Sequence, residues 1–388
     1  MQQNTNHPIK FKGDGNHFFG IWIVNILLSI ITLGIYSAWA TVRTKRYFYG
    51  NTYLAGDNFE YHAQPMQILK GRLVAFFAFF VWAIANSFFP VVSIVLLLFF
   101  AIALPFILWS NARFDAAMTS YRNVHFSFVT SLKQAYKVML GRGIGALVII
   151  SLYSFLVATA ATESVLLAVV LGLFSVIVLA IIYAWIAAGL HKYFSNGFQY
   201  GEWRFNADIG TGFFVKIYLK VMAFTILTII TSIALAYLAL SMNSHSLQPN
   251  DILPLMSEFS FVTFAIIYVF SIAFTIAATA YTTTRIRNYI YSHLVVSAQE
   301  NDNVQYKFNS NMTARGYARL IISNFLLQVI SLGIARPWVM VRTARYTADH
   351  TTVNGDMSLL KANDKASQVK SAVSDEVAQV FDVGFDIS

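Results

Sequence analysis

Long uncharged runs alternate with short basic stretches along this chain of 388 residues. The longest run, residues 73–109, contains no charged side chain. A hydrocarbon core about 30 Å thick is crossed by about 20 helical residues, so this run predicts two crossings with a break near Asn86 and Pro90. Over the whole chain the pattern predicts six membrane-spanning helices, at residues 73–89, 91–109, 143–161, 164–188, 216–240 and 260–283.

The six crossings form three tandem transmembrane helical hairpins, and a further hydrophobic segment lies near each end, at residues 18–40 and 317–335. The terminal segments share one passage: residues 25–47 and 324–346 are identical at thirteen of 23 positions, with a constant offset of 299. The expected fold class is therefore an all-α polytopic membrane protein with eight hydrophobic segments, two of which form an internal repeat.

Composition and charge support this class and set an orientation. Hydrophobic residues make up 57% of the chain and charged residues 12%, against about a quarter charged in soluble proteins. The four loops at residues 41–72, 110–142, 190–220 and 284–319 hold 19 of the 27 Lys and Arg. Basic loops stay on the cytoplasmic side. The net charge of +9 therefore indicates topology and contact with anionic lipid headgroups, not nucleic acid.

The basic loops also carry aromatic residues that alternate with polar ones, a pattern typical of half-buried strands. The four examples are Phe59-Glu60-Tyr61, Phe126-Ser127-Phe128, Trp203-Arg204-Phe205 and Tyr306-Lys307-Phe308. Turn residues at Ala55-Gly56 and Gly201-Glu202 predict short cytoplasmic β-hairpins between the units. We expect these strands to pair into one small layer.

The expected organisation is one integral membrane domain, residues 1–356, built of strand–helix–helix units. The middle units are residues 59–114, 126–193 and 203–289, and the terminal units are residues 11–47 and 306–346. Residues 357–388 form a cytoplasmic tail in which Val369, Val373 and Val377 recur at helical spacing. This spacing predicts a short amphipathic helix in the tail.

The terminal units are too short to cross the membrane twice, which leaves two arrangements open. Each can re-enter the bilayer as a helix–turn–helix that turns at Gly34 or Gly333, or each can cross once. A single final crossing would place six basic residues outside, against the positive-inside rule. We therefore expect re-entrant terminal segments and a cytoplasmic C-terminus. The two glycines and Pro337 are the candidate helix breaks, and a glycine helix cap is the simpler alternative.

Both terminal copies end in one motif, and its members are Trp39, Arg43, Arg46 and Tyr47 in the first copy and Trp338, Arg342, Arg345 and Tyr346 in the second. The Trp and the two Arg residues recur at i, i+4 and i+7, so they lie on one helix face. Guanidinium groups suit phosphate or carboxylate, which makes the motif a candidate lipid or anion site. The alternative is an interfacial anchor at headgroup depth.

No pattern of catalytic or metal-binding residues emerges from the sequence. The chain has no Cys, and its eight His residues show no pair at metal-ligand spacing. It contains no phosphate-binding loop and no nucleophile or metalloprotease motif. We therefore expect no enzymatic activity, no cofactor and no metal.

The Leu33-Gly34-Ile35 run, Trp39, Arg43, Arg46-Tyr47, the hairpin from Asn51 to Tyr61 and their C-terminal counterparts resemble the YjgN-like family of uncharacterised bacterial inner-membrane proteins. The resemblance implies a multi-pass inner-membrane protein and carries no mechanism. From the residues, the favoured function is a conduit or carrier for a small or lipid-like molecule. The alternative is a non-transporting scaffold whose basic cytoplasmic layer binds anionic lipid or a partner protein.

Overall fold

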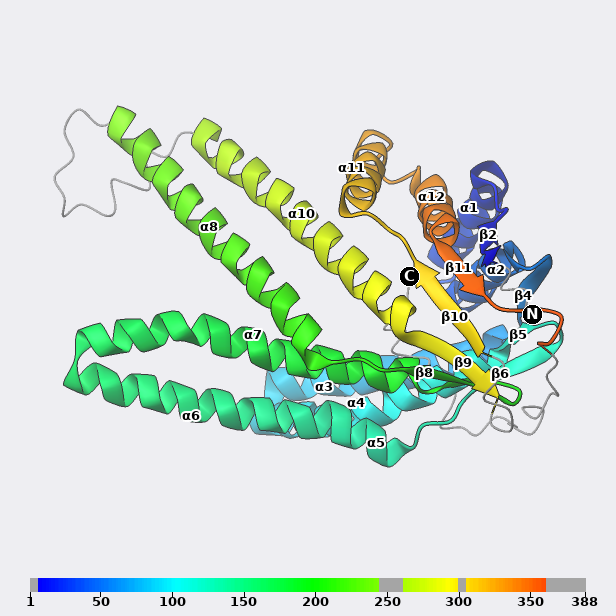
Figure 1. The fold of residues 1–388 in the computed structure, drawn as a ribbon, viewed down its shortest axis with the longest axis horizontal. Helices are drawn as coiled ribbons and strands as arrows, with labels where there is room; N and C mark the ends of the chain where they lie inside the picture. The colour runs from blue at the N-terminus through cyan, green and yellow to red at the C-terminus, as the bar shows by residue number, and fades with distance from the viewer. Residues whose placement is uncertain (1–5, 244–260, 299–304, 361–388) are drawn as a thin grey trace.

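The computed structural model describes residues 6–243, 261–298 and 305–360, and pairs of helices extend from one β-sheet (Figure 1). The predicted amphipathic helix in the tail lies outside the described residues. In order along the chain, the helices are α1 (Gly15–Ile31), α2 (Ser37–Gly50), α3 (Pro65–Phe88), α4 (Pro90–Met118), α5 (Leu132–Tyr136), the π-helical turn η1 (Lys137–Gly141), α6 (Arg142–Glu163), α7 (Val165–Ser195), α8 (Thr211–Asn243), α10 (Phe261–His293), α11 (Ala314–Ile330) and α12 (Arg336–Asp349).

Short strands before and after each helix pair build the sheet. They are β1 (Asn6–Pro8), β2 (Lys10–Phe11), β3 (Thr52–Leu54), β4 (Asp57–Tyr61), β5 (Thr119–Tyr121), β6 (Val124–Phe128), β7 (Phe198–Tyr200), β8 (Trp203–Ala207), β9 (Leu294–Ala298), β10 (Gln305–Ser310) and β11 (Thr351–Asn354). All neighbouring strands are antiparallel, in the order β1-β11-β10-β9-β8-β7-β6-β5-β4-β3-β2.

The first strand segment closes this sheet into a ring. Its β1 half pairs with β11, where His7 lies opposite Val353, and its β2 half pairs with β3, where Lys10 lies opposite Tyr53. The amide of Ile9 between the two halves donates to the carbonyl of Thr351 at 3.0 Å. Because one segment serves both ends of the strand order, the two ends of the chain meet, and a closed sheet has almost no free edge.

Aromatic and aliphatic side chains fill the inside of the ring. The third residue is buried in each of the strands β3, β5, β7, β9 and β11, and these residues are Leu54, Tyr121, Tyr200, Val296 and Val353. Phenol groups satisfy backbone carbonyls within this core: Tyr121 donates to Leu54 at 2.8 Å and Tyr200 donates to Tyr121 at 2.9 Å. Met357, beyond the last strand, packs into the same core. The interior is therefore a packed core.

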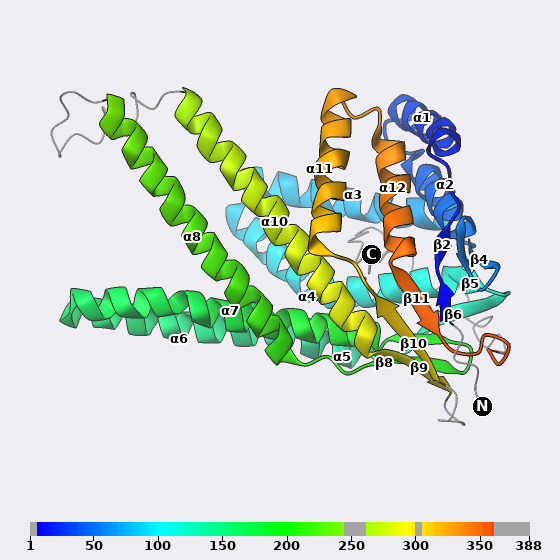
Figure 2. The same cartoon turned by 45° about the horizontal axis from the view of Figure 1, so that its top comes forward.

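The helix pairs leave the sheet in the same order as the strands and surround its axis. Contacts run from α2 to α3, from α4 to α5, from α7 to α8 and from α10 to α11, and α12 returns to α1. The long helix pairs diverge from one another with distance from the sheet. Both views show the pair α6–α7 moving away from the pair α8–α10 (Figures 1 and 2). Neighbouring hairpins thus pack closely near the sheet and diverge beyond it.

Six helical segments in the described residues are long and apolar enough to cross a membrane, which agrees with the predicted polytopic class. Of the most apolar 18-residue stretch in each, no more than 22% is buried. The all-α description was too narrow, because the short strands of all units pair into an eleven-stranded sheet. Period-two alternation identified the strands but not how many partners each one has.

The two terminal segments fold as helical hairpins that start and end at the sheet. At the end of α1, the amide of Gly34 donates to the Ser29 carbonyl at 2.7 Å and the amide of Leu33 donates to Ile30 at 3.1 Å. This is the Schellman pattern of helix termination. Leu332 and Gly333 repeat it at the end of α11. The chain therefore turns back at both predicted glycines.

Candidate functional site at the base of the helices

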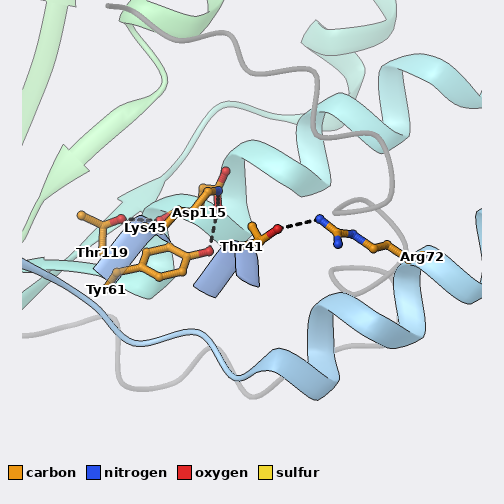
Figure 3. Close-up of polar contacts among 6 residues, drawn as sticks. All are labelled: Thr41, Lys45, Tyr61, Arg72, Asp115 and Thr119. Atoms are coloured by element: carbon orange, nitrogen blue, oxygen red, sulfur yellow. Dashed lines mark hydrogen bonds and ion pairs between the residues drawn. The ribbon is translucent and has the colours of Figure 1, made fainter. Parts of the chain in front are cut away.

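A polar cluster ties the first hairpin to the second at the level where the helices leave the sheet (Figure 3). Lys45 of α2 forms an ion pair of 2.9 Å with Asp115 of α4, and the Tyr61 hydroxyl donates to the same carboxylate at 3.2 Å. Arg72 of α3 donates to the hydroxyls of Ser37 at 2.6 Å and Thr41 at 2.7 Å. The cluster therefore links α2 to both helices of the next hairpin.

This cluster is half-buried, and its lysine and its carboxylate are paired with each other. The side chains of Lys45 and Asp115 are 24% and 31% exposed, so their attraction is stronger than that of a surface pair. Lys45 also lies 5.3 Å from the centre of the Tyr61 ring. Such an arrangement fixes helices relative to one another. The sequence signal for it was Asp115, the one acidic residue in the basic loop 110–142.

The second arginine of each terminal motif binds backbone. Arg345 donates to the Gly13 carbonyl at 2.8 Å and Arg46 donates to the Ala63 carbonyl at 3.0 Å. Each of these carbonyls lies two residues beyond the end of a strand, at the start of the next unit. Both guanidinium groups therefore join consecutive hairpins and already hold a partner.

Two unrelated side chains make the same type of contact in the middle of the chain. The indole of Trp109 donates to the Thr130 carbonyl and the amide of Asn288 donates to the Met312 carbonyl, both at 2.8 Å. In each case the second helix of one hairpin donates to the strand–helix junction of the next hairpin. Because Arg, Trp and Asn all fill this position, its requirement is a hydrogen-bond donor of sufficient reach, not a positive charge.

The first arginine and the tryptophan of each motif lie elsewhere. Arg43 is exposed and donates to the Tyr36 hydroxyl at 2.9 Å, while Arg342 donates to Ser323 at 2.9 Å. Trp39 stacks on Tyr36 within its own hairpin. Trp338 instead stacks on Phe19 of α1 and donates to Asn16 at 3.0 Å, so it joins the two ends of the chain.

The two motif tyrosines lie near the ends of α2 and α12, and the candidate helix break Pro337 lies at the start of α12. The Tyr47 hydroxyl accepts from the Asp14 amide at 2.8 Å and donates to the Asp14 carbonyl at 2.7 Å, beside the N-terminus of α1. The Tyr346 ring contacts the His350 ring in a tilted arrangement, with centroids 4.1 Å apart. Pro337 is buried in the first turn of α12, a position where the missing amide proton of proline costs nothing. The motif as a whole thus organises helix ends.

A second set of basic residues points outward at one level of the assembly. Four helical segments carry a basic residue at their sixth position. The segments begin at Pro65, Leu132, Thr211 and Ala314, and the basic residues are Lys70, Lys137, Lys216 and Arg319, in the same order. All four side chains are exposed. Five residues of α-helix advance about 7.5 Å, so these bases form a belt just beyond the sheet. We call these four residues the basic belt.

Among the described residues, no group of three or more His, Asp or Glu side chains is placed to hold a metal ion. The site chemistry consists of fixed positive charge, internal ion pairs and aromatic packing. Together with six apolar helices of membrane length, this defines a polytopic helical membrane protein with a closed β-sheet at one end.

Comparison with known proteins agrees with that class. Residues 6–380 match the family described as "Bacterial protein of unknown function (DUF898)", so the chain belongs to this family. It is 28% identical over 374 residues to the inner membrane protein YjgN of Salmonella typhimurium, covering 93% of this chain and 91% of that protein. It is 27% identical over 381 residues to YjgN of Escherichia coli K12, covering 94% and 92%. No solved structure matches the chain.

Proposed function

We propose that this protein is a non-enzymatic scaffold of the bacterial inner membrane that binds anionic phospholipid headgroups at its basic belt. The observation that carries the proposal is the belt itself: four exposed bases at the same position of four helical segments, directly below long apolar faces. Phospholipids place their phosphates at this depth, and cytoplasmic-leaflet lipids attract basic residues by about 1 kcal/mol each.

The orientation follows from the same residues. With the belt at the headgroup level, the sheet lies on the cytoplasmic side and the long hairpins extend into the bilayer. The terminal hairpins then enter the bilayer without crossing it. Their turns present Leu33 and Leu332, which are 94% and 92% exposed, and such apolar tips suit lipid. The relatives named as inner membrane proteins support this location.

The packed ring supports a scaffold over an aqueous conduit. Trp203 and Tyr306 are 5% and 2% exposed inside the sheet, and a hydrophilic solute has no path between such rings. The unit-by-unit arrangement around this core also supports our interpretation of the five helix pairs as repeats of one element, because the carbonyls at four of the strand–helix junctions are bound alike.

A carrier for a lipid-like molecule is the second candidate. The observation that favours it is the divergence of the hairpins α6–α7 and α8–α10 (Figure 2). Their long helices expose apolar side chains such as Phe155 and Leu173, which are about 70% exposed. A lipid can reach such faces sideways from the bilayer. Lipid exchange between labelled vesicles would separate the candidates, since a scaffold leaves the exchange rate at background.

The scaffold proposal is tested with full-length protein in nanodiscs of phosphatidylcholine with or without phosphatidylglycerol. We expect phosphatidylglycerol to raise the melting temperature, and we expect the double variant Lys137→Gln/Lys216→Gln to lose most of that rise. Lys307→Gln is the matched control, because Lys307 is an exposed lysine on strand β10. Equal stability of the wild type in both lipids would contradict the proposal.

A further inference from the structure

The closure of the sheet leaves a gap on one side of its first strand segment. The chain changes its pairing partner at Ile9: β1 pairs with β11 on one edge, and β2 pairs with β3 on the other. The edge of β1 that points toward β3 therefore faces the turn at Ala55 and Gly56. Within the described part of the chain, no strand pairs with that edge.

A hollow of about 240 Å³ that is partly open to solvent lies at this gap, and we call it the cavity. Its walls come from the first strand segment, with His7, Lys10 and Lys12, and from β3 and its turn, with Tyr53 and Gly56. One water molecule needs only about 10–15 Å³ of such space, so the cavity admits a larger polar group. It is smaller than typical drug-sized pockets of about 300–1,000 Å³, and a phosphate with a short organic group suits it.

The lining is positively charged and contains no carboxylate. Lys12 lies 3.9 Å from the centre of the Tyr53 ring, which holds its ammonium group at the wall. Two acidic residues near these walls have partners of their own: Asp57, which follows Gly56 in sequence, and Asp356, which interacts electrostatically with His7. Asp57 forms a 2.6 Å ion pair with Arg122, and Asp356 accepts hydrogen bonds from Ser358. Neither is a lining residue, so the two lysines face the cavity without an acidic neighbour in its wall.

The usual structural role of edge lysines does not account for Lys10 and Lys12. Lysines on exposed sheet edges prevent pairing with other chains. Here β2 is paired with β3, and the Lys12 ammonium lies over the Tyr53 ring of β3, so this lysine stands on the paired side of the segment and not at its outer edge. Lys10 and Lys12 line the same cavity, so their like charges repel each other, and a bound anion reduces that repulsion.

We propose that this cavity binds a phosphate-bearing anion. Lysine ammonium groups act as point charges that suit phosphate, whereas planar carboxylate recognition favours the guanidinium fork. Phosphate of this kind comes either from a small soluble compound or from a phospholipid headgroup. The site is separate from the basic belt, because none of the four belt residues lines it.

The test uses the full-length chain in a zwitterionic detergent, titrated with inorganic phosphate and with glycerol phosphate while thermophoresis and melting temperature are recorded. We expect saturable binding to the wild type and at least about tenfold weaker binding to Lys10→Gln/Lys12→Gln, because the double variant loses both charge-assisted hydrogen bonds to the anion. Lys133→Gln, an exposed lysine at the start of α5, should bind like the wild type.

The outcomes separate the sources of the anion. Binding of soluble phosphate that depends on the two lysines supports a small soluble ligand. A response only to phosphatidylglycerol nanodiscs, lost in the same double variant but kept in Lys137→Gln/Lys216→Gln, supports a lipid headgroup at the cavity. Absence of binding to every probe, or equal binding by wild type and Lys10→Gln/Lys12→Gln, overturns the proposal. If Lys137→Gln/Lys216→Gln keeps the full rise in melting temperature with phosphatidylglycerol, that result contradicts the scaffold function and does not affect the proposal for the cavity.

Discussion

Arg345 donates a hydrogen bond of 2.8 Å to the carbonyl oxygen of Gly13, although 332 positions separate the two residues. This contact lies beside the pairing of β1 with β11 and joins the last hairpin to the first. It repeats the contact between Arg46 and Ala63 at the next junction. One arginine of the candidate lipid or anion motif therefore helps to close the ring.

Replacing Arg345 should weaken this closure. Arg345→Gln removes a charge-assisted bond, and since the side chain is exposed we expect a loss of about 1 kcal/mol in the free energy of unfolding. Arg342→Gln is the control, because Arg342 donates to Ser323 within its own hairpin. Melting temperatures in detergent measure both. Equal melting temperatures for the two variants would argue against a role in closure.

The turn at Gly34 should tolerate no side chain without cost. Gly34 has a φ of +91°, and no heavy atom lies within 4 Å of the position that a Cβ atom would take there. Gly34→Ala therefore adds backbone strain alone, at about 1–2 kcal/mol. Gly20→Ala in the same hairpin also meets no atom, but it lies inside α1. There alanine should stabilise by about 0.5–1 kcal/mol. Opposite shifts in melting temperature are the expected result.

Alkaline pH should destabilise the ring through its buried phenols. Burial, with the neighbouring Tyr121, raises the pKa of Tyr200 to about 12, and burial, with the carboxylate of Asp356, raises the pKa of Tyr306 to about 12. Unfolded tyrosines ionise near pH 10. The unfolded state therefore loses protons first, and the free energy of unfolding falls as pH rises from about 10 to about 12.

Tyr200→Phe/Tyr306→Phe checks this assignment. The double variant starts less stable, because the carbonyls of Tyr121 and Asp356 lose their donors, but its melting temperature should fall less steeply above about pH 10. Scanning fluorimetry from pH 8 upward measures both curves. Parallel curves for wild type and double variant would show that other groups control the alkaline transition.

The ion pair between Lys45 and Asp115 should couple the first two hairpins. A double-mutant cycle with Lys45→Gln and Asp115→Asn isolates the interaction, and we expect a coupling of about 1 kcal/mol that decreases with added salt. Thr119, which donates to the Asp115 backbone carbonyl, is unaffected by either change. Additive effects of the two substitutions would mean that the pair contributes nothing to stability.

The membrane topology can be read with single cysteines, because the chain has none of its own. A membrane-impermeant thiol reagent added to intact cells should label Glu163→Cys, between α6 and α7. It should label Ser388→Cys only after the membrane is opened. Leu33→Cys at the tip of the first hairpin should resist labelling from both sides. Labelling of Ser388→Cys in intact cells would exclude the re-entrant arrangement.

The sequence by itself determined the parts of this protein that depend on local pattern. Uncharged length set the six long helices, since each must match the same hydrocarbon thickness. Alternating aromatics located strands β4, β6, β8 and β10, and the repeated Leu-Gly located both short turns, because these features need only neighbouring residues.

Only the tertiary structure decided how those parts meet. The pairing of His7 with Val353, the carbonyl partners of Arg46 and Arg345, and the cavity beside Lys10 all join residues from different units. Arginine at a helix end carries the same local signal whether it contacts a headgroup or a backbone carbonyl. Which of these partners the arginine contacts depends on the groups that closure of the ring places near it. Ring closure in turn requires all five hairpins together.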